Sequence, residues 1–127
     1  MSVTKQLISI IILCSVSTVA LAHGQYPQII SKYVHSEDVE VKFTLGNFFA
    51  KRTCYDIEVN GYIASPMREC LNPNQTKEMS IWVKTTPDIK TENQICSIGN
   101  TPGMLRTRMC TVSTTLFPRK LLLNELE

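Results

Sequence analysis

The sequence has few of the groups on which enzymes and nucleic-acid-binding proteins depend. It contains 2 histidines, and 13 basic side chains are nearly balanced by 11 acidic ones, for a formal net charge of +2. No G-x-S-x-G, H-E-x-x-H or glycine-rich phosphate loop is present. The carboxylates are scattered, and Asp56 and Glu58, which share one strand face, are typical of a solvated surface. We therefore expect a protein that is not an enzyme and has no nucleic-acid partner.

The one long apolar run lies at the beginning of the chain. Lys5 is followed by an uncharged stretch, residues 6–22, which ends in the small-x-small sequence Ala20-Leu21-Ala22. This layout is typical of a secretory signal peptide and predicts cleavage after Ala22, which makes the protein secreted or periplasmic. A membrane anchor is the alternative, because the run approaches the length of a span. The cleavage sequence favours removal, so no integral membrane span is expected in the mature chain.

Cysteine is scarce but even in number after the leader. Cys14 leaves with the signal peptide, and the following 105 residues contain four cysteines: Cys54, Cys70, Cys96 and Cys110. An even count in a small exported domain predicts two disulfides. Their spacings of 16, 26 and 14 residues differ from the close C-x2-4-C pairs of zinc sites.

Amphipathic helices are also missing, and short alternating segments take their place. Residues 39–45, 53–59 and 79–86 alternate between apolar and polar side chains, which is the pattern of half-buried strands. Asn60-Gly61 supplies the left-handed residues of a tight turn. Six or seven such strands predict a small antiparallel β-sandwich.

The clearest hairpin lies within residues 93–117. Its centre is Pro102-Gly103, a pair that suits a type II turn, and Cys96 and Cys110 each lie seven residues from Gly103. The hairpin therefore places these two cysteines opposite one another. A bridge there closes a loop of about 15 residues and contributes about 3 kcal/mol in the chain-entropy picture. By elimination Cys54 pairs with Cys70, although the sequence leaves the two other connectivities open.

The pattern divides the mature chain into three parts. Residues 23–38 form an N-terminal lead-in, in which 28–34 is a candidate short edge strand. Residues 39–118 form the sandwich, and residues 119–127 a tail with marginal helical character. The order of the segments, with the polar loop 71–78 before a middle strand, resembles the loose pattern of immunoglobulin-like modules in exported proteins. The resemblance implies an immunoglobulin-like β-sandwich stapled by two disulfides. The resemblance does not indicate a function, because sandwiches of this kind serve many unrelated functions.

His23 becomes the first residue of the mature chain if cleavage follows Ala22. A free terminal amine and an imidazole on one residue can together chelate a metal. In this position His23 resembles the first residue of two groups of exported copper proteins, the lytic polysaccharide monooxygenases and the small periplasmic copper carriers. The resemblance implies copper held by His23 and a second histidine, and only His35 is available. A small copper-binding protein is therefore one alternative function.

The leading hypothesis is an exported, non-enzymatic module that presents loops or a sheet edge to a protein partner. Three predicted loops are candidate contact surfaces: 46–52, 60–76 and 99–105. They carry the aromatic residues Phe48, Phe49 and Tyr62, which are candidate anchors for a partner. A secreted inhibitor or toxin is a further alternative. Asn74 begins an Asn-Gln-Thr glycosylation sequence, which matters only in a eukaryote.

Overall fold

The computed structural model describes residues 22–103 and 105–124, so the predicted leader lies outside this range except for Ala22. The described chain forms eight strands and a short helix: β1 (His23–Tyr26), β2 (Ile29–Tyr33), β3 (Asp38–Asn47), β4 (Thr53–Val59), β5 (Tyr62–Leu71), β6 (Gln75–Lys84), β7 (Thr91–Gly99), β8 (Thr107–Leu116) and α1 (Arg119–Asn124).

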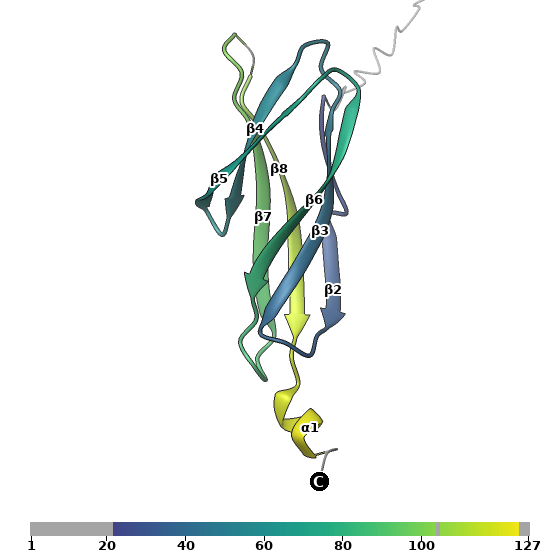
Figure 1. The fold of residues 1–127 in the computed structure, drawn as a ribbon, viewed down its shortest axis with the longest axis vertical. Helices are drawn as coiled ribbons and strands as arrows, with labels where there is room; N and C mark the ends of the chain where they lie inside the picture. The colour runs from purple at the N-terminus through teal and green to yellow at the C-terminus, as the bar shows by residue number, and fades with distance from the viewer. Residues whose placement is uncertain (1–21, 104, 125–127) are drawn as a thin grey trace, which may run out of the picture.

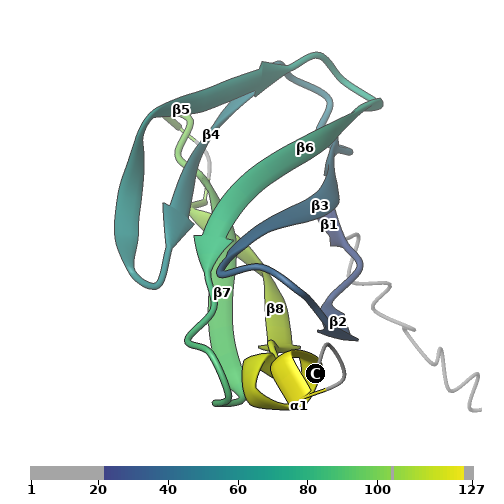
Figure 2. The same cartoon turned by 60° about the horizontal axis from the view of Figure 1, so that its bottom comes forward.

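These strands form two sheets that pack face to face (Figures 1 and 2). The first sheet has the order β1-β3-β6, and the second has the order β2-β8-β7-β4-β5. Neighbouring strands are antiparallel except β2 and β8, which run parallel. The α1 helix follows β8 at one end of the sandwich (Figure 1). The prediction of a small immunoglobulin-like β-sandwich with two disulfides is confirmed.

Alternation along the strands produces the core. On β3 the side chains of Val39, Val41, Phe43 and Leu45 are buried, while Lys42 on the opposite face is exposed. The core cluster joins them to apolar residues of the other strands: Tyr55, Ile57, Leu71, Met79, Ile81, Val83 and Ile95. Side chains on one face of a strand share a direction, so a period of two in the sequence becomes one apolar layer between the sheets.

The predicted turns and cross-links have the expected positions. Asn60 and Gly61 have φ values of +52° and +87° and form the two-residue loop between β4 and β5. In the β7–β8 hairpin, Gly103 has a φ of +79°. One disulfide joins β4 to β5 through Cys54 and Cys70, and the other joins β7 to β8 through Cys96 and Cys110. Each disulfide therefore fastens two neighbouring strands of the second sheet.

The predicted lead-in, residues 23–38, requires a correction, because two strands of the sandwich lie within it. β1 pairs with β3 in the first sheet, and β2 pairs with β8 in the second. The chain changes sheet at Pro27, which follows a cis peptide bond. The sandwich thus begins at His23. The candidate edge strand at 28–34 contains β2. β1 escaped the sequence pattern because it buries the polar side chains of His23 and Gln25 where a strand usually buries apolar ones.

Candidate functional site

Because the chain changes sheet at Pro27, β3 and β8 are each paired along only part of their length on this side of the sandwich. β1 pairs only with Thr44–Asn47 of β3, and β2 pairs only with Val112–Leu116 of β8. On this side of the described sandwich, no strand therefore pairs with residues 107–111 of β8, called here the upper half-edge. The same holds for residues 38–43 of β3, called the lower half-edge. In Figure 1 the upper half-edge lies toward the N-terminal end of β8, away from α1.

The main-chain groups of the upper half-edge point away from β7. Val112 donates its N–H to the carbonyl of Gln28 at 2.8 Å, and Leu116 accepts the N–H of Val34 at 2.9 Å. Even-numbered residues of β8 therefore direct their main-chain groups toward the β2 side. Because this direction repeats every second residue, Arg108 and Cys110 point theirs into the lane beyond the end of β2. The disulfide of Cys110 holds this half of β8 against β7.

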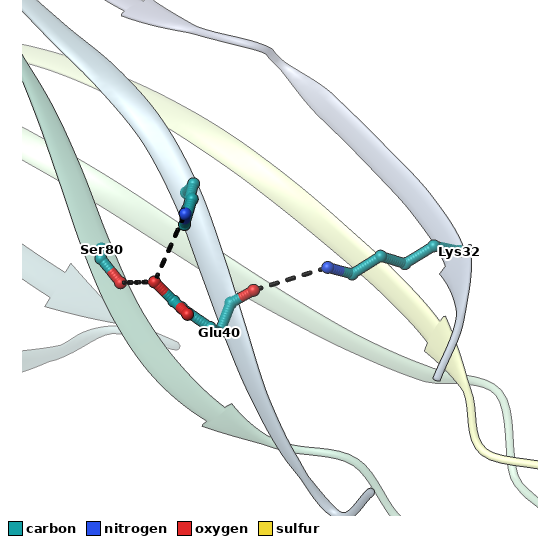
Figure 3. Close-up of polar contacts among 4 residues, drawn as sticks. Lys32, Glu40 and Ser80 are labelled. Carbon is teal, nitrogen blue, oxygen red and sulfur yellow. Dashed lines mark hydrogen bonds and ion pairs between the residues drawn. The ribbon is translucent and has the colours of Figure 1, made fainter. Parts of the chain in front are cut away.

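The lower half-edge has the same geometry. Phe48 donates its N–H to the carbonyl of Ala22 at 2.7 Å, so even-numbered residues near the end of β3 face β1. Because this direction repeats every second residue, the main-chain groups of Glu40 and Lys42 point into the lane beside β3 in which β1 no longer runs after Pro27. Lys32 of β2 reaches across this lane, with its Nζ 3.5 Å from the main-chain oxygen of Glu40 (Figure 3).

The outer edges of the two sheets carry residues that oppose strand addition. β5 contains Pro66, which has no N–H to offer a neighbouring strand. β6 carries the charged side chains of Lys77, Glu78 and Lys84, and charges of this kind protect edge strands from pairing. The half-edges beside Pro27 are therefore better candidates for binding than β5 or β6.

A buried polar network fastens β1 across the sandwich. His23 Nε2 lies 2.7 Å from Ser97 Oγ, and its Nδ1 lies 2.9 Å from Thr107 Oγ1. Ser97 donates its hydroxyl proton in a hydrogen bond to Gln25 Oε1 at 2.5 Å, so its oxygen accepts a hydrogen bond from the ring N–H of His23. The neutral imidazole therefore carries its proton on Nε2, and its Nδ1 accepts the hydroxyl proton of Thr107.

Gln25 completes this network. Its Nε2 donates to the carbonyl of Ile95 and to Thr111 Oγ1, both at 2.9 Å. Thr111 in turn donates to the carbonyl of Pro27 at 2.7 Å, beside the point where the chain changes sheet. Two of the hydroxyls that β8 turns inward, those of Thr107 and Thr111, thus find partners on β1. Farther along β8, Thr115 pairs with Thr85, and the buried hydroxyl of Ser113 has no hydrogen-bond partner among the described residues.

His23 is held as a neutral base. Its side chain is only 2% exposed, and burial lowers the pKa of His23 from 6.5 to about 4. Its ring also packs against Tyr55, with ring centroids 4.5 Å apart. Both ring nitrogens already have hydroxyl partners.

The two histidines of the copper hypothesis are not brought together. His23 pairs with Asn47 at the end of β3, whereas His35 is exposed just before Asp38, where β3 begins. Ten strand residues separate the two ends, which amounts to about 30 Å. Across residues 22–103 and 105–124, no three side chains of His, Cys, Asp or Glu gather in a way that could hold a metal ion.

The aromatic residues predicted to bind a partner also lie apart. Phe48 is 46% exposed, and its ring covers the cross-strand pair of Gly24 and Gly46. Phe49 is half-buried and donates its N–H to Asn47 Oδ1. Tyr62 is 80% exposed, but it lies past the far end of β4 from Phe48 and Phe49. The three side chains therefore do not form one patch, and Phe48 has a packing role of its own.

Sequence reasoning predicted a sheet edge as a binding surface but did not locate it. The missing signal was Pro27, preceded by alternating His23 and Gln25 and followed by the apolar pair Ile29-Ile30. A proline between two short strand-like segments is a signal for a strand that leaves its sheet. No helix among the described residues is long and apolar enough to cross a membrane.

Comparisons with known proteins identify the fold and leave the family open. No known family matches the sequence, and no curated protein matches it. Among solved structures, the chain is similar to the E. coli chaperone DraB, with a TM-score of 0.59 and 17% identity over 76% of this chain and 55% of that one. A chaperone–tip adhesion subunit complex, CsuC–CsuE from the archaic chaperone-usher Csu pili of Acinetobacter baumannii, matches with a TM-score of 0.49 and 10% identity over 76% of this chain and 57% of that one. The chain thus spans little more than half the length of these proteins. The likeness to DraB establishes an immunoglobulin-like β-sandwich.

Proposed function

We propose that this chain is an exported, non-enzymatic protein-binding module that receives an extended segment of its partner at the upper half-edge. The observation that carries the proposal is that no described strand pairs with residues 107–111 of β8 on the side toward which Arg108 and Cys110 direct their main-chain groups. A segment that binds on this side continues the second sheet beyond the end of β2. Its main chain gains hydrogen bonds with β8, which is the way in which strand addition provides affinity.

Two further observations support this function. The upper half-edge is held in place before any partner arrives, because Cys96–Cys110 binds it to β7 and His23 contacts Thr107 from β1. A preorganised edge loses little conformational entropy when it binds. The fold is similar to that of DraB, which is a chaperone, and binding other polypeptides is what chaperones do. The two disulfides favour an oxidising compartment outside the cytoplasm, secreted or periplasmic.

A proline substitution tests the edge directly. Arg108→Pro removes the N–H that faces the lane, and it leaves the N–H groups of the odd-numbered residues that bond to β7. Peptides selected from a displayed random library on the wild-type protein serve as the probe. We expect Arg108→Pro to abolish their binding, and we expect hydrogen exchange at Arg108 and Cys110 to slow when a peptide binds to the wild type.

Matched controls separate the edge from the side chain. Arg108→Ala removes the ion pair with Glu58 (3.2 Å) but keeps the main-chain N–H, so it is expected to keep binding. Glu78→Pro places the same ring on the outer edge of β6 and is also expected to bind normally. Equal binding by Arg108→Pro and the wild type, or exchange protection confined to other strands, contradicts the proposal.

A further inference from the structure

We propose that the lower half-edge is a second docking site, which accepts an extended segment that carries a carboxylate from a partner protein. The site lies beside β3 in the first sheet, whereas the upper half-edge belongs to β8 in the second. The two sites therefore use different main-chain groups and can be tested one at a time.

The lower half-edge opens into a groove of about 460 Å³. Its walls come from β2 and the following loop, from β3, and from Trp82 of β6. Ile30 and Val34 pack against the core and form its apolar floor, and the side chain of Trp82 is 65% exposed at its outer side. The groove thus offers apolar surface to one face of an incoming segment and the main chain of Glu40 and Lys42 to its edge.

Lys32 occupies the lane that the segment would enter. It lies between Ile30 and Val34 on the inward-facing side of β2, and its Nζ contacts the main-chain oxygen of Glu40 at 3.5 Å (Figure 3). An inward-pointing charge is one of the ways in which proteins protect an open edge. The contact is long and exposed, so an N–H of an incoming strand can replace it and give Glu40 a shorter hydrogen bond.

The charges of the groove indicate the chemistry of the segment. The carboxylate of Asp38 pairs with Lys84, and that of Glu40 accepts the hydroxyl proton of Ser80 at 2.7 Å. Lys42 lies 3.9 Å from the same Glu40 oxygen. Among the described ion pairs, none includes Lys32. When the incoming strand displaces Lys32 from Glu40, the ammonium group of Lys32 remains beside that strand. A carboxylate on the strand can then form an ion pair with it.

Two short capped peptides of alternating valine and threonine serve as probes, one with a central glutamate and the other with a central lysine. We expect the glutamate peptide to shift the amide resonances of Glu40 and Lys42 in the nuclear magnetic resonance spectrum of the isotope-labelled protein. Lys32→Glu should weaken its binding about fivefold, which is the scale of an exposed ion pair. The same variant should bind the lysine peptide better than the wild type does.

Main-chain variants separate this site from the upper half-edge. Lys42→Pro removes an N–H that faces the groove and should abolish the shifts, while Lys42→Ala should retain them. Arg108→Pro should leave the shifts unchanged, so that either site can fail alone. The proposal is overturned if the wild type binds both peptides equally or if the glutamate peptide shifts Arg108 and Cys110 instead. It is also overturned if only Lys32→Ala binds, because Lys32 then acts purely as an edge guard.

Discussion

Acid is expected to destabilise the fold through one buried side chain. His23 is neutral in the folded state, with a pKa lowered by burial to about 4, whereas its ordinary value is 6.5. A base whose pKa falls on folding contributes stability above the unfolded value, and this contribution is lost as the pH falls from 6.5 toward 4. In this pH range the imidazole of His23 is protonated in the unfolded chain and neutral in the folded chain, and the difference favours unfolding.

The size of the effect follows from the two pKa values. Each pKa unit corresponds to about 1.36 kcal/mol, so the whole shift amounts to about 3.4 kcal/mol below pH 4. Between pH 7 and pH 4.5 the expected loss is about 2.5 kcal/mol. For a domain of this size that loss lowers the melting temperature by about 10 °C or more. His23 is 2% exposed, so solvent screening does not reduce the effect substantially.

Comparison with a variant that cannot titrate isolates this contribution. His23→Gln keeps a donor and an acceptor at the site, and carboxylates titrate in both proteins. We expect urea unfolding to show that the wild type loses about 2.5 kcal/mol more than His23→Gln between pH 7 and pH 4.5. Imidazole nitrogen resonances should report a proton on Nε2 at neutral pH. Equal losses in the two proteins, or a measured pKa of His23 near 6.5, would refute the reasoning.

Two further predictions concern stability. Replacing both Cys96 and Cys110 by serine should lower the free energy of unfolding by about 3 kcal/mol, since the bridge closes a loop of about 15 residues. Urea unfolding without reductant measures this, and an unchanged midpoint would show that the bridge does not constrain the unfolded chain. Gly24→Ala should cost about 1 kcal/mol, because the added Cβ lies 2.7 Å from the ring of Phe48, which then has to swing away. In a Phe48→Ala background the same change should cost nothing, and additive effects in the double-mutant cycle would rule out this contact.

The strands that bury apolar side chains could be predicted from the sequence, and the strand that buries polar ones could not. Val39, Val41 and Phe43 alternate with charged and polar residues, so β3 can be predicted from its own sequence without knowledge of the strands beside it. His23 and Gln25 also occupy alternate positions, on the inward face of β1. A polar side chain is buried, however, only where other residues supply its hydrogen-bond partners. Those partners are Ser97 and Thr111, more than 70 residues away.

The binding edges show the same division. Sequence reasoning predicted that a sheet edge or the loops contact a partner, and it named Phe48, Phe49 and Tyr62. Which edge is open depends on where β1 and β2 each stop pairing, and that is a property of strands brought together from distant parts of the chain.

By itself, the sequence determined the layer of apolar residues, the turns at Asn60-Gly61 and Pro102-Gly103, and the opposition of Cys96 and Cys110. All of these depend on residues close together in the chain, where spacing sets direction and hairpin geometry sets register. The tertiary structure alone decided that β1 and β2 belong to different sheets and that His23 is buried as a neutral base. It also decided that β3 and β8 each keep one half-edge open. These features depend on contacts between distant segments, and no local pattern of residues records which segments meet.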